Sequence, residues 1–134
     1  MVRFTVIGKP RPKGSMKAFV PKGWDRAVLT SSNPSVKEWE QTIRLVAQEF
    51  SEAFTTGPVR VGLRFALPRP KSLSVKSSRL HTKRPDIDKL SRAVLDALTD
   101  VLWADDSQVF SLTARKVYAL PSQPPRVDIT ITSL

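Results

Sequence analysis

The stretch Val59-Arg60-Val61-Gly62-Leu63-Arg64-Phe65 decides the fold class of this chain. Its apolar side chains alternate with Arg60, Gly62 and Arg64, and a period of two is typical of a β-strand with one buried face. One helical pattern precedes this strand and another follows it. The order of strands, helix, strand, helix and strands predicts one α/β (α+β) domain, residues 1–134, with a mixed β-sheet packed against two main helices.

Two segments repeat apolar residues at the spacing of a helix. The first runs from about Ser35 to Ala53, and Ser35-Val36-Lys37-Glu38 has the pattern of a capping box. Its apolar positions are Val36, Trp39, Ile43, Val46, Ala47 and Phe50. The second runs from about Asp88 to Leu98, and its buried stripe consists of Leu90, Val94, Ala97, Leu98 and Val101.

Further strands are predicted at Val2–Val6, Val109–Tyr118 and Val127–Ile131, with a hairpin of 17–20 and 27–30 around Pro21-Lys22-Gly23. Residues 67–84 are rich in proline, serine and basic residues and have no periodicity. A loop of this length in a small domain is usually either functional or disordered.

The composition favours a polyanionic partner. Lysine and arginine total 22 against 12 acidic residues, which gives a formal charge of +10. Repulsion between so many positive charges opposes a compact fold, so a charge of this size usually serves to bind a polyanion. Nucleic acid is the first candidate for that partner and an anionic membrane is the second. The chain has no cysteine and one histidine, His81, so disulfides, zinc–thiolate sites and multi-histidine sites are excluded. No apolar run approaches a membrane span and the N-terminus resembles a strand rather than a signal peptide, so we expect a cytoplasmic protein without a membrane partner.

Basic residues gather in two loops, where counterion release would supply affinity for DNA. The first cluster is Lys9, Arg11, Lys13 and Lys17, and the second is Arg69, Lys71, Lys76, Arg79, Lys83 and Arg84. The alternative is that both are solvated loops. The second cluster leads directly into the acidic part of the chain, which favours a functional role.

Half of the 12 acidic residues lie between positions 86 and 106, and all six are aspartate: Asp86, Asp88, Asp96, Asp100, Asp105 and Asp106. Short carboxylates suit hard cations such as Mg²⁺, which takes oxygen ligands and binds through one or two carboxylates plus water and phosphate. If residues 86–88 are extended, Asp86 and Asp88 leave the same face and Ile87 points to the core. The alternative is that Asp88 caps the second helix and Asp86 is a solvated loop residue.

Asp105 and Asp106 stand at the start of the strand that opens near Val109, where they can meet ligands from the loop before the helix. The alternative here is an acidic turn with Trp103 as core filler. Asp100, and in part Asp96, fit a ladder of charges on an exposed helix face.

These motifs resemble the RusA family of Holliday junction resolvases, the crossover junction endodeoxyribonucleases of bacteria and their phages. The matching stretches are Arg84-Pro85-Asp86-Ile87-Asp88-Lys89-Leu90, Asp96-Ala97-Leu98, Trp103-Ala104-Asp105-Asp106-Ser107-Gln108-Val109 and Lys116, together with the opening Gly8-Lys9-Pro10-Arg11-Pro12-Lys13-Gly14. Motif order and spacing agree from about Lys83 to Lys116.

The resemblance implies a homodimeric endonuclease, dependent on Mg²⁺ or Mn²⁺ and on no small-molecule cofactor, that resolves four-way DNA junctions by paired nicks in recombination and repair. It makes Asp86, Asp88 and Asp106 the essential, metal-binding acids, with Asp105 as an accompanying ligand. Lys116 matches the downstream lysine of the pattern, and we expect it to contact DNA.

Two positions depart from the family pattern. Lys89 stands where the family usually has asparagine, and Arg92 stands where it has a catalytically important lysine. Arginine keeps the positive charge but cannot give up a proton near neutral pH. Arg92 or Lys89 is therefore expected to stabilise charge on the phosphate. His81 is expected to be exposed, as a DNA contact or an inert residue rather than a general base.

Two rival interpretations remain open on the residues alone. One is a non-catalytic, basic nucleic-acid-binding protein whose acids are caps and turns. The other is a metal-dependent nuclease of other branched DNA, such as flaps.

Overall fold

The computed structural model describes residues 1–14, 16–19, 28–31, 35–74 and 79–134, with 16–19 and 28–31 as backbone only. The strands are β1 (Val2–Ile7), β2 (Met16–Phe19), β3 (Val28–Ser31), β4 (Val59–Leu67), β5 (Val109–Tyr118) and β6 (Arg126–Ser133). The α-helices are α1 (Val36–Ala47) and α2 (Ile87–Leu98), and the 3₁₀ helices are η1 (Gln48–Ala53) and η2 (Asp106–Gln108).

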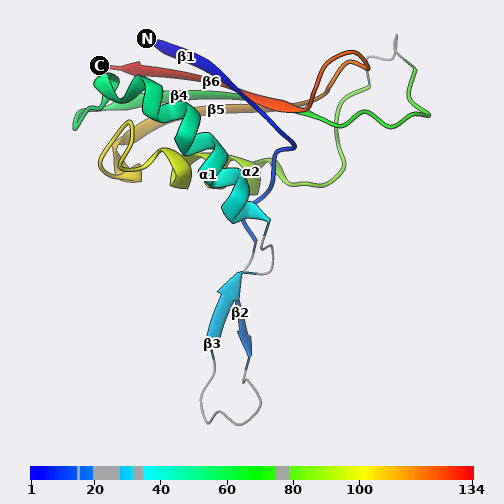
Figure 1. Ribbon diagram of the computed structural model, residues 1–134, viewed down its shortest axis with the longest axis horizontal. Coiled ribbons are helices and arrows are strands. Elements are labelled where there is room, and N and C mark those ends of the chain that lie inside the picture. The colour runs from blue at the N-terminus through cyan, green and yellow to red at the C-terminus, as the bar shows by residue number, and fades with distance from the viewer. Residues whose placement is uncertain (15, 20–27, 32–34, 75–78) are drawn as a thin grey trace.

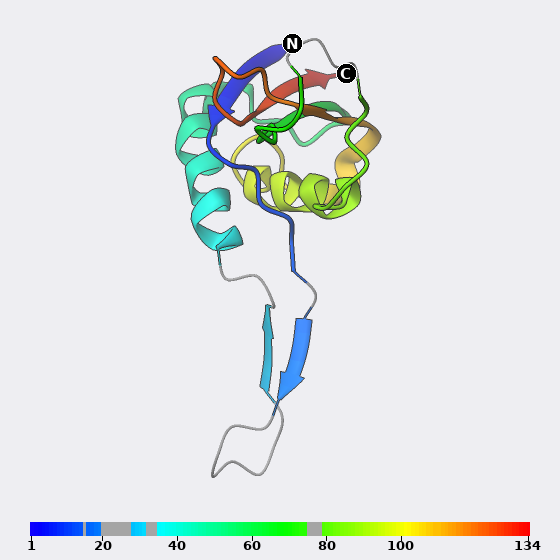
Figure 2. The ribbon, with the colours of Figure 1, turned by 90° about the vertical axis from the view of Figure 1, so that its right-hand side faces the viewer.

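The main sheet has the order β1-β6-β4-β5. The β4–β5 pair is parallel, whereas β6 pairs antiparallel with both β1 and β4. A parallel pair needs a crossover connection, and α2 supplies it. Both α-helices lie on one face of this sheet, and the β2–β3 hairpin projects away from the body (Figures 1 and 2). The predicted mixed sheet with two helices in a single domain is therefore confirmed.

The core lies between the sheet and the helices. Every second residue of β4 from Val59 to Phe65 is buried, as the alternation predicts. Trp103, which follows α2, is fully buried, and so are Ile43 of α1 and Leu90 of α2. The helical stripes predicted from the sequence thus meet the apolar face of β4. Among the helices formed by the described residues, none is both long and apolar enough to cross a membrane.

Some local expectations about the helices are wrong. The first helix ends at Ala47 and continues as the 3₁₀ helix η1, in which Phe50 has non-helical dihedrals. Ser35 makes no side-chain capping hydrogen bond, because its own backbone is already helical (φ −69°, ψ −13°) rather than extended as a capping residue requires. Asp100 lies beyond the end of α2 with φ 71°, so it belongs to a turn and not to a ladder of helix charges. The turn of the predicted hairpin, Pro21-Lys22-Gly23, and Ala27 lie outside the described residues.

Gly8 ends β1 in a conformation that other residues rarely adopt, with φ 147°. A Cβ atom at this position would lie 2.9 Å from Cζ3 of the buried Trp39 ring. We therefore expect Gly8→Ala to lower the free energy of unfolding by about 1–3 kcal/mol, through backbone strain and overpacking together. Urea denaturation followed by tryptophan fluorescence measures this change.

Gly62→Ala in β4 is the matched control for that measurement. Its added Cβ would meet Thr113 Oγ1 at 3.5 Å and Thr130 Cβ at 3.8 Å, which are ordinary contacts. Alanine in a strand should leave stability unchanged or raise it by about 0.5–1 kcal/mol. Equal stability of the two variants would refute the special role of Gly8.

Candidate functional site

Asp86 and Asp88 stand at the N-terminus of α2 and both are exposed. Asp86 occupies the N-cap position with extended backbone (φ −72°, ψ 139°), and its carbonyl accepts the first helical bond from the Leu90 N–H. The expected extension of residues 86–88 is wrong, because the helix already begins at Ile87, whose side chain is 37% exposed rather than in the core. Asp88 follows Asp86 by only about half a helical turn, so the two carboxylates leave different sides of α2 and line different grooves.

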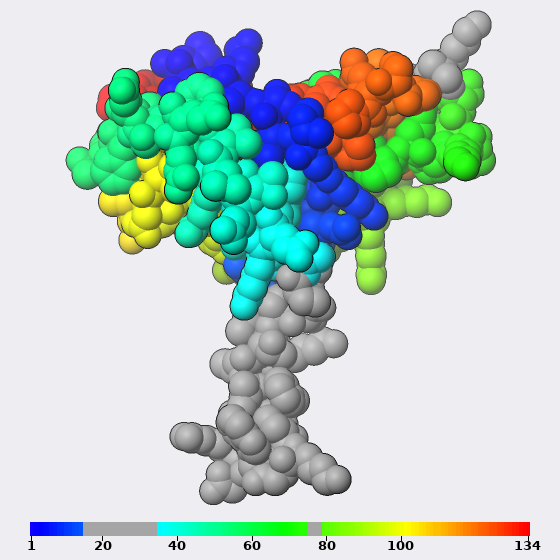
Figure 3. All heavy atoms as spheres, viewed as in Figure 1, coloured from blue at the N-terminus to red at the C-terminus, as the bar shows by residue number. Residues whose placement is uncertain are grey.

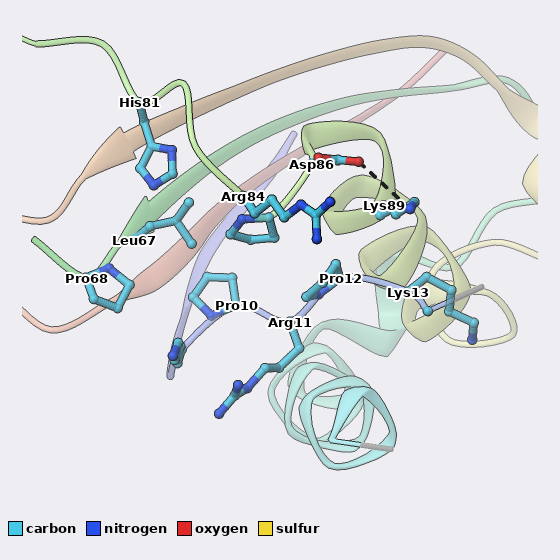
Figure 4. A pocket seen from close by; sticks show the side chains of 13 residues that line it. Pro10, Arg11, Pro12, Lys13, Leu67, Pro68, His81, Arg84, Asp86 and Lys89 are labelled. Carbon is cyan, nitrogen blue, oxygen red and sulfur yellow. Dashed lines mark ion pairs between the residues drawn. The ribbon is translucent and has the colours of Figure 1, made fainter. Parts of the chain in front are cut away.

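Asp86 lies on the wall of a cleft with a strongly basic lining, which we call the basic cleft. Its lining comprises residues 9–14 together with Leu67, Pro68, His81, Arg84, Pro85, Asp86 and Lys89 (Figure 4). In this view the guanidinium of Arg84 extends toward Asp86 and Lys89, whereas the side chain of Arg11 extends away from them. The structure thus brings the first basic cluster and the end of the second cluster to one of the predicted catalytic acids.

Two backbone hydrogen bonds hold the N-terminal segment along this cleft. The Gly8 N–H donates to the Pro125 carbonyl at 3.0 Å, and the Lys13 N–H donates to the Lys89 carbonyl at 3.0 Å. Proline at positions 10 and 12 keeps the intervening chain extended, since each proline fixes its own φ and disfavours a helical residue before it. Figure 3 shows the segment (blue) on the surface beside the start of α1 (cyan).

Three of the predicted DNA contacts are engaged within the protein. Lys13 forms ion pairs with Glu40 at 2.8 Å and Asp96 at 3.2 Å. Burial lowers the pKa of Lys13, but hydrogen bonds and charge from these two acids outweigh it, so the net pKa is raised. Arg69 donates to the carbonyls of Ala119 at 3.0 Å and Ser74 at 2.8 Å.

Lys116 is the third of these residues. Its ammonium donates to the carbonyl oxygens of Lys83 at 2.7 Å and Pro85 at 2.9 Å. These bonds tie β5 to the loop directly before Asp86. The geometry therefore gives Lys116 a role in positioning the start of α2, and its expected contact with DNA stays a prediction.

The remaining predicted DNA contacts fall into two groups. Lys9, Arg11 and Arg84 line the basic cleft. Lys71, Arg79 and Lys83 are exposed and stand outside the cleft lining as far as the structure describes it. Lys76 and the side chain of Lys17 lie outside the described residues.

The two cations that depart from the family pattern lie on different sides of α2. Lys89 lines the basic cleft, and its Nζ is 3.8 Å from Asp86 Oδ2. Arg92 is exposed and lines a separate groove between α2 and β5, which Asp88 also lines. Lys89 is thus the cation beside Asp86, and Arg92 the one in the groove of Asp88.

Asp105 and Asp106 lie at the other end of α2, in the turn before β5. Asp105 accepts a hydrogen bond from the Ser107 N–H at 2.8 Å, and this bond lowers the pKa of Asp105. Asp106 Oδ1 accepts from Trp103 Nε1 at 3.1 Å and also from the Thr99 hydroxyl. Asp105 therefore serves as a structural cap, whereas Asp106 is oriented by two donors on a single oxygen.

Gln108 is a structural residue of this site that sequence reasoning missed. Its side-chain oxygen accepts from the N–H groups of Ala104 and Asp105, both at 2.8 Å, and its amide donates to the Thr55 and Gly57 carbonyls, both at 2.9 Å. The signal was available, because an acid followed three residues later by glutamine is a capping-box pattern.

The predicted essential acids, Asp86, Asp88 and Asp106, lie at the two ends of α2 and do not converge within the chain as described. Asp86 is the N-cap of α2 and Asp88 lies in its first turn, whereas Asp106 bonds to Thr99 just after the helix ends. The 12-residue helix between the two ends is about 18 Å long. Among the described residues, no group of three or more acids or histidines is placed to hold a metal ion. Asp86 and Asp88 each offer carboxylate oxygens, the kind of ligand that Mg²⁺ takes, and Mg²⁺ needs only one or two carboxylates from the protein.

His81 is less exposed than expected. Its ring packs against Tyr118 with centroids 4.4 Å apart. Burial, followed by the positive charge of Lys116, lowers the pKa of His81, which disfavours the charged imidazolium form. The ring forms part of the basic cleft without adding to its charge.

Fold and site together define a one-domain α+β protein that gathers cations around exposed carboxylates, as enzymes that act on nucleic acid do. Residues 4–132 match the family model described as Endodeoxyribonuclease RusA. The chain belongs to the RusA family of endodeoxyribonucleases. It is also similar to the protein named "Uncharacterized protein YqaN" of Bacillus subtilis (strain 168), with 32% identity over 140 residues that cover 97% of this chain and 94% of YqaN.

Proposed function

We propose that this protein is a metal-dependent endodeoxyribonuclease that resolves four-way (Holliday) DNA junctions by paired nicks in recombination and repair. The observation that carries the proposal is the basic cleft with Asp86 on its wall, in a chain of the RusA family. Five lysine and arginine residues and one acid line this cleft, which suits a DNA backbone approaching a catalytic carboxylate.

Cleavage of a phosphodiester needs a bound phosphate, an activated water and neutralisation of the developing charge. Arg11 and Arg84 line the basic cleft and are proposed to bind phosphates. Lys89, next to Asp86, is proposed to stabilise negative charge on the reacting phosphate. Arg92 lines the other groove, beside Asp88. As an arginine it can stabilise negative charge but cannot donate a proton.

The proposed cofactor is Mg²⁺ or Mn²⁺, held by Asp86 and Asp88. Such an ion, when bound, lowers the pKa of a coordinated water and neutralises phosphate charge. The exposure of both carboxylates supports the proposal, since they are accessible to an ion and to substrate. Asp106 is proposed as the third essential acid and Asp105 as its accompanying ligand.

The deciding experiment compares four-way, three-way, flap and linear duplex DNA under identical conditions, with Mg²⁺, Mn²⁺, Ca²⁺ or EDTA. We expect Mg²⁺ and Mn²⁺ to support symmetrical nicks in the four-way junction, mapped at nucleotide resolution. Preferential cutting of flaps would favour the broader branched-DNA nuclease. Binding without cleavage in any metal would leave only the non-catalytic nucleic-acid-binding protein.

Binding through the basic cleft should depend steeply on salt. We expect the logarithm of the association constant for junction DNA, measured in Ca²⁺, to fall linearly with the logarithm of the salt concentration. Arg11→Ala should reduce that slope by about 1, because it removes one phosphate contact. Arg3→Ala, an exposed change on β1 outside the cleft lining, is the control. An unchanged slope for Arg11→Ala would argue against DNA in this cleft.

Lys116→Met tests the positioning role of this lysine. Without the bonds to the Lys83 and Pro85 carbonyls, the start of α2 should shift, and a displacement of about 1 Å can cost about 10²-fold in rate. We expect cleavage to fall by about 10–100-fold, faster amide exchange at the first turn of α2, and an unchanged salt slope of binding.

Arg115→Met is the matched control, because Arg115 is the exposed neighbour of Lys116 on β5. A reduced salt slope for Lys116→Met, with unchanged amide exchange, would instead restore the direct DNA contact expected from the sequence.

A further inference from the structure

Lys13 lines two concave surfaces of the molecule at once. One is the basic cleft, and the other is a groove that contains Asp106, which we call the Asp106 groove. The Asp106 groove is also lined by residues of α1, of the end of α2 and of the turn before β5, namely Glu40, Arg44, Asp96, Thr99 and Asp105. A contact that Lys13 makes with these acids can therefore affect the cations of the basic cleft.

The Lys13 ammonium joins the N-terminal segment, residues 9–14, to both α-helices. Its Nζ lies 2.8 Å from Glu40 Oε1 of α1 and 3.2 Å from Asp96 Oδ2 of α2. The side chains of these acids are 17% and 34% exposed, so both are partly shielded from water. The Lys13 N–H also donates to the Lys89 carbonyl of α2. Shielded, hydrogen-bonded ion pairs are stronger than pairs at an open surface, so Lys13 attaches the segment firmly.

The two helices that supply these acids are joined to each other without the help of Lys13. Arg44 of α1 donates through Nε to the Ala97 carbonyl at 3.0 Å and through Nη2 to the Asp96 carbonyl at 3.3 Å. The carboxylates of Glu40 and Asp96 are thus held close together, and they would repel each other without a cation between them. They form a preformed site for an ammonium group from the N-terminal segment.

The N-terminal segment depends on such an attachment because its backbone is irregular. Residues 9–14 belong to no helix or strand, and Pro10 and Pro12 have no N–H to donate. Arg11 stands only two residues before Lys13 and lines the basic cleft. The place of Arg11 on the cleft wall therefore follows the place of Lys13.

We propose that Lys13 is a positioning residue, which together with Glu40 and Asp96 holds the N-terminal segment so that Lys9 and Arg11 can bind phosphates in the basic cleft. The proposal rests on the proposed function and gives Glu40 and Asp96 a role in it. Charge argues against a direct contact of Lys13 with DNA. One ammonium beside two carboxylates leaves an excess of negative charge, which repels a phosphate.

Two variants that break the same contact from opposite sides test this role. Lys13→Met removes the ammonium, whereas Glu40→Gln/Asp96→Asn keeps it and neutralises both of its partners. If Lys13 positions the segment, each variant should raise the Kd for a four-way junction in Ca²⁺ by about 10-fold, because each loosens the phosphate contacts of the segment. If Lys13 contacts DNA instead, Glu40→Gln/Asp96→Asn should bind more tightly than the wild type, because a cation is freed and two negative charges are lost. Tighter binding would overturn the proposal.

The combined variant and a conservative variant give a second readout. Lys13→Met/Glu40→Gln/Asp96→Asn should bind about as weakly as either parent, because one contact can be lost only once. Lys13→Arg should stay within about 3-fold of the wild type, because it keeps a cation between the two acids. Additive losses, or a Lys13→Arg protein as weak as Lys13→Met, would contradict the positioning role. Lys37→Met is the matched control, since Lys37 is an exposed lysine of α1 outside the lining of both concave surfaces.

Amide exchange of the free protein tests the attachment without DNA. In Glu40→Gln/Asp96→Asn, the Lys13 N–H that bonds to the Lys89 carbonyl should exchange about 10-fold faster, with an unchanged circular dichroism spectrum. Wild-type exchange at this amide would refute the attachment, whatever the protein does with DNA. If exchange rises as expected but the wild type cuts no DNA, the proposed function fails while the attachment of the segment stands.

Discussion

Asp86→Asn is expected to reduce junction cleavage by about 10²–10³-fold or more while leaving junction binding in Ca²⁺ nearly unchanged. Asparagine keeps the size of the side chain and one oxygen, so the basic cleft should keep its shape. It removes the negative charge that faces Lys89 Nζ at 3.8 Å and that would attract a divalent ion. A small gain in affinity for DNA is expected, because one repulsive carboxylate leaves the cleft.

Asp100→Asn is the matched control for that variant. Asp100 belongs to the same acidic stretch and is exposed, but it lies in the turn after α2 with φ 71°. Asparagine tolerates this left-handed conformation, so the substitution neutralises a carboxylate without straining the backbone. Single-turnover cleavage and gel-shift titration measure the two effects separately. Full activity of Asp86→Asn would remove Asp86 from the catalytic machinery.

Trp103→Ala is expected to lower the free energy of unfolding by about 3–5 kcal/mol, the usual cost of removing a large aromatic side chain from a core. Trp103 is fully buried, and its indole N–H donates to Asp106. Its carbonyl also accepts from the Asp100 N–H at 2.6 Å, so the ring and the turn support each other. Urea denaturation at constant m-value measures the loss.

Trp103→Phe separates packing from the hydrogen bond. Phenylalanine retains much of the apolar volume but removes one of the two donors that orient Asp106. We expect a smaller loss of about 1–2 kcal/mol in stability, together with reduced cleavage at unchanged DNA binding. If Trp103→Ala unfolds at the wild-type urea concentration, the turn before β5 is held by other contacts.

The helical stripe of α2 and the alternation of β4 were readable because burial imposes a period on a local stretch of chain. The residue at which α2 begins could not be predicted in this way. Asp86, Ile87 and Asp88 are compatible with both an extended and a helical start. The preceding loop is held by bonds from Lys116, which stands 28 residues after Asp88. Gln108 shows the opposite case, since its capping pattern lies within four residues and could have been recognised.

The basic residues show the same limit. Lys13 and Arg11 look equivalent in the sequence. In the structure, however, Lys13 forms ion pairs with Glu40 of α1 and Asp96 of α2, so its charge is already partly neutralised. Such pairings depend on which helix faces lie next to the N-terminal segment, and spacing along the chain carries no information about them.

By itself, the amino-acid sequence determined the fold class, the excess of positive charge and the family motifs with their order, because these follow from local periodicity, composition and spacing. Only the tertiary structure decided where the acids lie. The helix α2 lies between the two acidic motifs. Asp86 and Asp88 therefore stand at one end of a helix about 18 Å long, and Asp106, which bonds to Thr99 just after α2, stands at the other. The spacing of the motifs along the chain does not reveal that separation.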